Sequence, residues 1–133
     1  MRRIMLVGMC SVVLAAVVLA VGASASPRDD LFRSSWTSID TDGSHQTLKI
    51  RGSGQSGHYA MVLFDDSATA ACHGSPARFK GSGLVDGDSL LMTGTLTCMP
   101  GGNRLRGRTS LGFVYDPGTD TLSDDSGVTW YRA

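Results

Sequence analysis

The sequence predicts an all-β domain: a small antiparallel barrel of seven to eight short strands with one disulfide, or alternatively a two-sheet β-sandwich. After residue 26, turn signals recur about every eight to twelve residues, a spacing typical of short antiparallel strands. Glutamate is absent, and Gly, Ser, Thr and Asp are abundant, which disfavours helices. Nearly every predicted connection is as short as a hairpin, so we expect an up-and-down barrel that leaves no open edge.

The first 25 residues have the three zones of a secretory signal peptide. Arg2 and Arg3 give the positive start, residues 4–21 form an apolar run, and Ala23-Ser24-Ala25 provides small residues before a cleavage site. We therefore predict a signal peptide, 1–25, and one exported domain, 26–133, in a secreted, periplasmic or cell-surface location. An uncleaved membrane anchor is the alternative, because 18 apolar residues reach the lower limit for crossing a bilayer.

Hydrophobic alternation and turn residues locate the strands of the exported domain. Gln46, Leu48 and Ile50 share one face of their segment, which predicts a half-buried strand. A later strand is expected to break near Gly81 and Gly83, because glycine weakens strand interiors. The predicted strands are 32–39, 45–51, 59–64, 69–72, 77–85, 89–98, 109–115 and 128–132.

The cysteine count predicts one disulfide. Cys10 lies in the predicted signal peptide, so Cys72 and Cys98 are left in the exported domain. Two cysteines in an oxidising compartment are expected to pair. The bond would close a loop of about 27 residues and would stabilise the fold by roughly 3–4 kcal/mol.

Charge and motifs exclude several classes of function. Without the signal peptide the domain has 10 basic and 12 acidic residues, too balanced for a general nucleic-acid binder. Residues 52–57 match G-x-G-x-x-G, but a strand follows them where a dinucleotide site needs a helix. Residues 40–44 begin like a calcium loop, but the chain has no glutamate to complete it. We therefore predict no cofactor, no metal site and no catalytic residue.

Arg104, Arg106 and Arg108 alternate along one short segment. If that segment is extended, their guanidinium groups project to one side and form an anion site for carboxylate, phosphate or a charged polymer. The alternative is a soluble strand edge, where cationic side chains discourage pairing with another chain. The sequence leaves both interpretations open.

The segment from residue 36 to residue 59 resembles the first two hairpins of avidin-type and lipocalin-type barrels. The residues that carry this resemblance are Trp36-Thr37-Ser38, then Gly43-Ser44, then Gly57-His58-Tyr59. In those families a tryptophan near the start packs across the barrel floor. The resemblance implies that Ser38 stands where the avidin-type pattern has an asparagine and that Ser44 and Tyr59 match ligand-contacting positions.

We expect a non-enzymatic exported domain that binds a small ligand or an extracellular partner, either a protein or a polymer. The aromatic residues expected near a ligand cavity are Trp36, Tyr59, Phe113 and Trp130. The alternatives are a protein–protein module, such as an inhibitor of an extracellular hydrolase, and a hydrolase that uses two loop aspartates. Fold alone does not decide between them.

Overall fold

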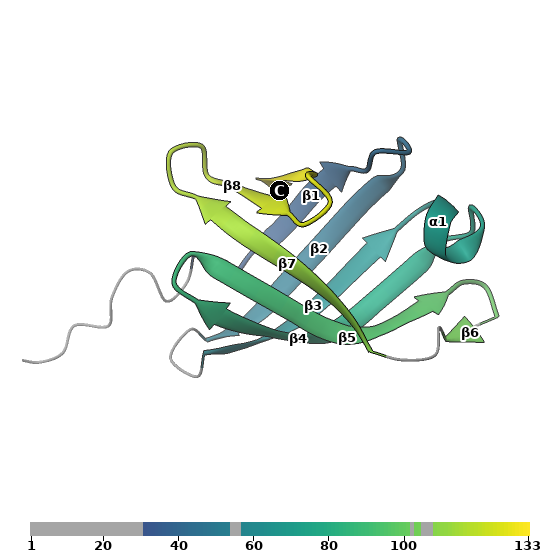
Figure 1. Cartoon of the computed structure of the whole chain (residues 1–133), viewed down its shortest axis with the longest axis horizontal. Coiled ribbons are helices and arrows are strands. Elements are labelled where there is room, and N and C mark those ends of the chain that lie inside the picture. The colour runs from purple at the N-terminus through teal and green to yellow at the C-terminus, as the bar shows by residue number, and fades with distance from the viewer. Residues whose placement is uncertain (1–30, 54–56, 102, 105–107) are drawn as a thin grey trace, which may run out of the picture.

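The computed structural model describes residues 31–53, 57–101, 103–104 and 108–133 (Figure 1). The predicted signal peptide, 1–25, lies outside the described residues. Within those ranges, no helix has both the length and the apolar character needed to cross a membrane.

The chain forms a closed, eight-stranded, up-and-down antiparallel barrel, so the predicted barrel is confirmed (Figure 1). Each barrel strand pairs with the next one along the chain, and the ring closes where the last strand pairs with the first. A short additional strand, β6 (Asn103–Arg104), extends the sheet from the end of β5. The barrel strands are β1 (Ser35–Ile39), β2 (His45–Ser53), β3 (His58–Asp65), β4 (Ala77–Asp86), β5 (Ser89–Cys98), β7 (Thr109–Asp116), β8 (Thr121–Asp124) and β9 (Thr129–Arg132).

Alternating side chains fill the barrel interior. In β2 the inward residues Gln46, Leu48 and Ile50 are 8%, 0% and 2% exposed, as their sequence pattern predicts. Because successive strand residues point to opposite faces, their neighbours Thr47 and Lys49 face solvent. The same alternation in the other strands builds one contiguous apolar core inside the barrel.

Two local predictions are wrong. Residues 69–72, expected as a strand, form a short helix, α1 (Thr69–Cys72), because the alanines around them favour helix and His73 ends it in a left-handed conformation. The expected break near Gly81 does not occur, and β4 stays paired with β5 along its whole length. There Gly81 lies directly opposite Gly94, and the absent side chains let the two backbones approach closely.

The predicted disulfide is confirmed. Cys72 and Cys98 are bonded, with their Cα atoms 5.5 Å apart. The bond joins α1, which belongs to the connection between β3 and β4, to the last residue of β5. It therefore fixes that connection against the end of the barrel.

Aromatic side chains plug one end of the barrel, which we call the closed end. The ring of Phe32 lies edge-on to those of Tyr59 and Tyr115, with centroid separations of 6.3 and 6.2 Å. Trp36 is fully buried beside them and donates from Nε1 to the Phe32 carbonyl oxygen, 3.0 Å away. The segment that precedes β1 thus fills the space between the strand ends.

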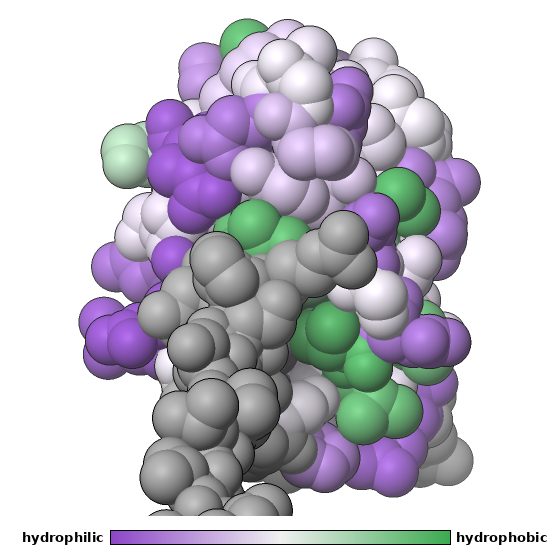
Figure 2. Space-filling model, turned by 90° about the vertical axis from the view of Figure 1, so that its left-hand side faces the viewer, coloured by the Kyte–Doolittle hydropathy of each residue, from purple (hydrophilic) through white to green (hydrophobic). Residues whose placement is uncertain are grey.

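Arg132 ties β9 across the closed end. Its guanidinium group donates to both carboxylate oxygens of Asp120 and to the Leu31 carbonyl oxygen, and it lies 4.2 Å from the ring centroid of Trp36. The hydrogen bond from Arg132 lowers the pKa of Asp120, whereas burial, followed by the bond to Asp120, raises the pKa of Tyr115. Figure 2 views this end and shows hydrophilic residues around small hydrophobic groups.

Candidate functional site

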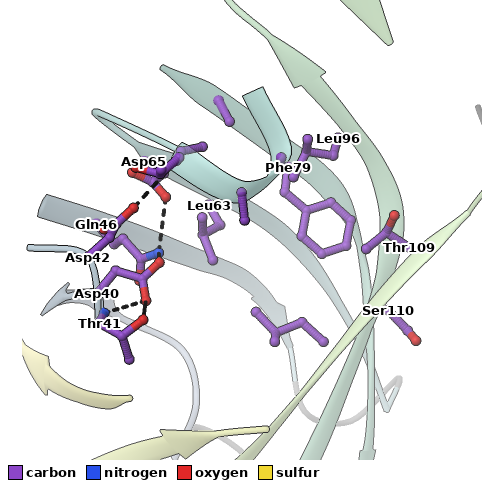
Figure 3. A pocket seen from close by; sticks show the side chains of 16 residues that line it. Asp40, Thr41, Asp42, Gln46, Leu63, Asp65, Phe79, Leu96, Thr109 and Ser110 are labelled. Atoms are coloured by element: carbon purple, nitrogen blue, oxygen red, sulfur yellow. Dashed lines mark hydrogen bonds between the residues drawn. The ribbon is translucent and has the colours of Figure 1, made fainter. Parts of the chain in front are cut away.

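A pocket of about 420 Å³ lies at the other end of the barrel (Figure 3). It is bounded by the turn between β1 and β2, by the connection that contains α1, and by the ends of β3, β4, β5 and β7. Its lining residues are Asp40, Thr41, Asp42, Gln46, Leu63, Asp65, Ala68, Thr69, Ala70, Ala71, Ala77, Phe79, Leu96, Thr109, Ser110 and Leu111.

The wall of the pocket is apolar. Leu63, Phe79, Leu96 and Leu111 come from four different strands, and the alanines in and before α1 cover the remaining side. Leu63 and Phe79 face each other across the β3–β4 ladder, and Phe79 pairs with Leu96 across the β4–β5 ladder. Such a wall favours the apolar part of a ligand, because it removes apolar surface from water.

The carboxylates and the Gln46 amide gather on one side of the pocket, whereas Thr109 and Ser110 lie on the opposite side (Figure 3). Gln46 Nε2 donates to Asp40 Oδ2 at 2.9 Å and to Asp65 Oδ2 at 3.2 Å. Asp65 is only 6% exposed and also accepts a hydrogen bond from the Ser67 amide. Both N–H groups of the Gln46 amide are therefore held by carboxylates.

The carbonyl oxygen of the same amide is left without a partner. Gln46 Oε1 is buried and accepts no hydrogen bond within the described part of the chain. The two carboxylates fix the orientation of the amide, because reversing it would place Oε1 against negative oxygens. A buried acceptor without a donor costs about 1–3 kcal/mol, so this amide is a strained point in the lining of the pocket.

Asp42 anchors the turn between β1 and β2 to α1. Its carboxylate accepts hydrogen bonds from the Ser44 amide at 3.0 Å and the Thr69 amide at 3.4 Å. The Ser44 amide, followed by Thr69, lowers the pKa of Asp42 from 3.8 to about 2. The Ser44 hydroxyl also lowers the pKa of Asp42, but by less than the Ser44 amide and Thr69 do. Its oxygen makes no hydrogen bond of good geometry within the described residues.

We expect Asp42 to titrate with a midpoint near pH 2 in the folded protein. Because the folded-state pKa lies below the ordinary value of 3.8, the stabilisation by Asp42 is present above about pH 4 and is lost as the pH falls through about 2. Carboxyl-carbon NMR measures the midpoint, and the Thr69 amide shift should move with it. A peptide with the same local sequence is the control, and a midpoint near 3.8 in both would contradict the anchoring.

The ligand-contact residues that the resemblance implied do not lie together. Ser44 lies at the pocket end of the barrel, where it is buried, whereas Tyr59 belongs to the closed end. Ser38 donates from Oγ to the Thr129 carbonyl oxygen at 2.7 Å, which ties β1 to β9. None of these three lines the pocket.

The remaining aromatic candidates belong to the core. Trp130 is fully buried, lies edge-on to Phe113 at 5.9 Å, and donates from Nε1 to Asp124 Oδ2 at 2.9 Å. With Trp36 they fill the barrel interior rather than the pocket. A ligand-binding role for them stays a prediction.

The arginine segment lies at the edge of the described structure. Arg104 belongs to β6, and Arg106 lies outside the described residues. Arg108 is exposed and lines a second pocket, of about 590 Å³, on the outer face of β4 and β5, together with Arg78 and Lys80. The anion site thus stays a prediction, with two further cations beside Arg108.

Sequence reasoning missed Gln46 and Asp65 as site residues, although the alternation pattern contains a signal for both. Gln46 shares the inward face of β2 with Leu48, and Asp65 shares the inward face of β3 with Leu63. A polar side chain at an inward position of a strand is more informative than a polar residue in a turn. Both residues therefore stand out once the inward faces are assigned.

A comparison of the chain with protein-family models, with curated proteins and with solved structures finds no match. In the part of the chain that the structure describes, no group of three or more histidine, cysteine or acidic residues is arranged to hold a metal ion. The candidate function therefore rests on the geometry of the pocket.

Proposed function

We propose that this chain is an exported small-molecule-binding barrel and that its ligand occupies the pocket beside α1. The observation that carries this proposal is the difference between the two barrel ends. Phe32, Tyr59 and Tyr115 plug the closed end, whereas the other end holds a pocket with an apolar wall and a polar side. A ligand enters such a mouth with its apolar part first.

The size and the fold support this proposal. A volume of about 420 Å³ falls within the range of small-molecule sites, which are mostly apolar with a few placed polar groups. Eight strands are also the number with which lipocalins and streptavidin hold one small ligand. The resemblance of residues 36–59 to those barrels points to the same class.

Export is supported by the bond between Cys72 and Cys98 and by the predicted signal peptide. Disulfides persist in oxidising environments and are rare in reducing ones. The proposed protein therefore meets its ligand outside the cytoplasm, in the periplasm, at the cell surface or in the medium.

The substitution Ala70→Trp should block the pocket. Ala70 is exposed and lines the mouth, so an indole at this position covers the entrance without displacing a core residue. We expect the affinity for N-phenyl-1-naphthylamine, a neutral apolar dye, to fall roughly tenfold or more, the effect of losing about 1.4 kcal/mol. Dye fluorescence measures the affinity, and circular dichroism checks the fold.

Ala60→Trp is the matched control. Ala60 is an exposed alanine on β3 that does not line the pocket, so this variant should bind the dye like the wild type. If both variants bound the dye equally well, the pocket would not be the site. If the wild type bound no dye, the proposal would be wrong, and the protein–protein module would become the leading hypothesis.

A further inference from the structure

We infer that the ligand carries a cationic head with N–H donors, such as a protonated amine, amidine or guanidine, on an apolar body. This inference rests on the proposed function and names the chemical class of the ligand. It follows from three properties of the pocket: the charge of its polar side, the free acceptor on Gln46, and the character of its wall.

The polar side of the pocket is negative. Asp40, Asp42 and Asp65 all line it, and no basic side chain occurs among the described lining residues. Asp65 is almost fully buried and Asp40 is half-buried, so water screens their charges less than those of exposed carboxylates. An anionic head would be repelled there, whereas a cation would be attracted.

Gln46 favours a ligand head that carries a hydrogen-bond donor. Its side chain lines the pocket and is only 8% exposed, and its amide hydrogens are already bound by Asp40 and Asp65. The buried Oε1 accepts no hydrogen bond within the described structure. An N–H group of the ligand head that approaches the two carboxylates lies next to this amide, and Oε1 accepts its hydrogen bond once the side chain turns to expose the oxygen to the pocket.

The wall distinguishes between kinds of cation. Quaternary ammonium groups have no N–H donor and are typically bound inside cages of several aromatic rings. Phe79 is the single aromatic residue among the described lining residues, and the rest of the wall is Leu and Ala. The pocket therefore offers little cation–π attraction, and it favours a head that donates hydrogen bonds to Gln46 and the aspartates.

Four probes with a short alkyl chain test the inference on the full exported chain. They are hexylammonium, hexyltrimethylammonium, hexan-1-ol and hexanoate, whose alkyl chains differ by at most one methylene and whose heads differ in charge and in N–H donors. We expect hexylammonium to bind roughly tenfold more tightly than hexan-1-ol, as one charge-assisted hydrogen bond implies, with hexanoate the weakest. Amide-shift titrations by NMR measure each affinity, and added salt should weaken the binding of the two cations and leave that of hexan-1-ol unchanged.

Variants of the acidic side give the second test. Asp40→Asn should lower the affinity for hexylammonium about tenfold and leave that for hexan-1-ol unchanged, since the variant keeps the size of the side chain and loses its charge together with one acceptor oxygen. Asp65→Asn should lower the affinity for hexylammonium by the same factor. It gives an independent measurement if the Asp40 substitution disturbs the turn between β1 and β2. Asp86→Asn is the control, because Asp86 is an exposed carboxylate at the closed end.

The outcomes separate this inference from the function on which it rests. Equal affinity for all four probes would overturn the cationic head and leave the binding pocket standing. Equal affinity for the two cations would overturn the need for N–H donors. If neither the probes nor the neutral dye bound, both the inference and the proposed function would be wrong.

Discussion

Trp36→Ala should lower the free energy of unfolding by about 3–5 kcal/mol, the usual cost of removing a large buried side chain. Trp36 is 0% exposed, its Nε1 donates to the Phe32 carbonyl oxygen, and its ring lies beneath the Arg132 guanidinium group. The substitution therefore leaves a cavity, an acceptor without its donor and a cation without its ring. Urea denaturation followed by circular dichroism measures the loss.

Two further variants show which part of Trp36 matters. Trp36→Phe keeps an aromatic ring and loses the Nε1 donor, so it should cost about 1–2 kcal/mol. Ile39→Ala truncates a residue that is 63% exposed on the same strand and should change stability by about 0.5 kcal/mol or less. If Trp36→Ala stayed as stable as the wild type but lost dye binding, Trp36 would be a ligand contact, as expected of the aromatic residues near a cavity.

Gly94→Ala should be among the most damaging single-methyl additions in the barrel. A Cβ atom at this position would lie 2.1 Å from the Lys80 carbonyl oxygen and 2.7 Å from the Gly81 Cα atom. Both neighbours are backbone atoms, so the methyl group fits only if β4 and β5 separate. We expect a loss of roughly 3 kcal/mol or more, the upper range for overpacking. Guanidinium denaturation measures it.

Ser82→Ala is the control for the glycine variant. Ser82 is an exposed residue of β4, next to Gly81, and its substitution should change stability by about 0.5 kcal/mol or less. A Gly94→Ala protein as stable as the wild type would show that the strands can separate without cost. The close approach at Gly81 and Gly94 would then contribute little to the shape of the barrel.

The sequence predicts much of the strand arrangement, because a strand with one buried face repeats every second residue. This rule places Gln46, Leu48 and Ile50 inward and locates the long strands within about two residues of their observed ends, apart from the late start of β1. It fails for β8, whose four residues are too few to show alternation. It also fails at residues 69–72, because this segment is too short to show a periodic pattern and its helix propensity determines that it forms α1.

The pocket is harder to predict, because residues far apart in the sequence form it. Asp40, Asp65 and Leu111 meet only when the ladders between their strands fix the registers. Which barrel end stays open depends on the segment before β1, since Phe32 packs between Tyr59 and Tyr115. Packing of this kind leaves no local pattern, so the sequence explains Trp36 and Trp130 equally well as core residues and as residues near a ligand cavity.

The bond between Cys72 and Cys98 affects where in the cell the structure of the pocket is finished. The barrel ladders need only hydrogen bonds, whereas the helical wall of the pocket is sealed to β5 by a covalent link. That link forms only where an oxidant is present. In the exported protein that we propose, the disulfide beside the pocket thus forms only after the chain has crossed the membrane. A newly made chain in the reducing cytoplasm would lack the covalent link that holds α1 against β5.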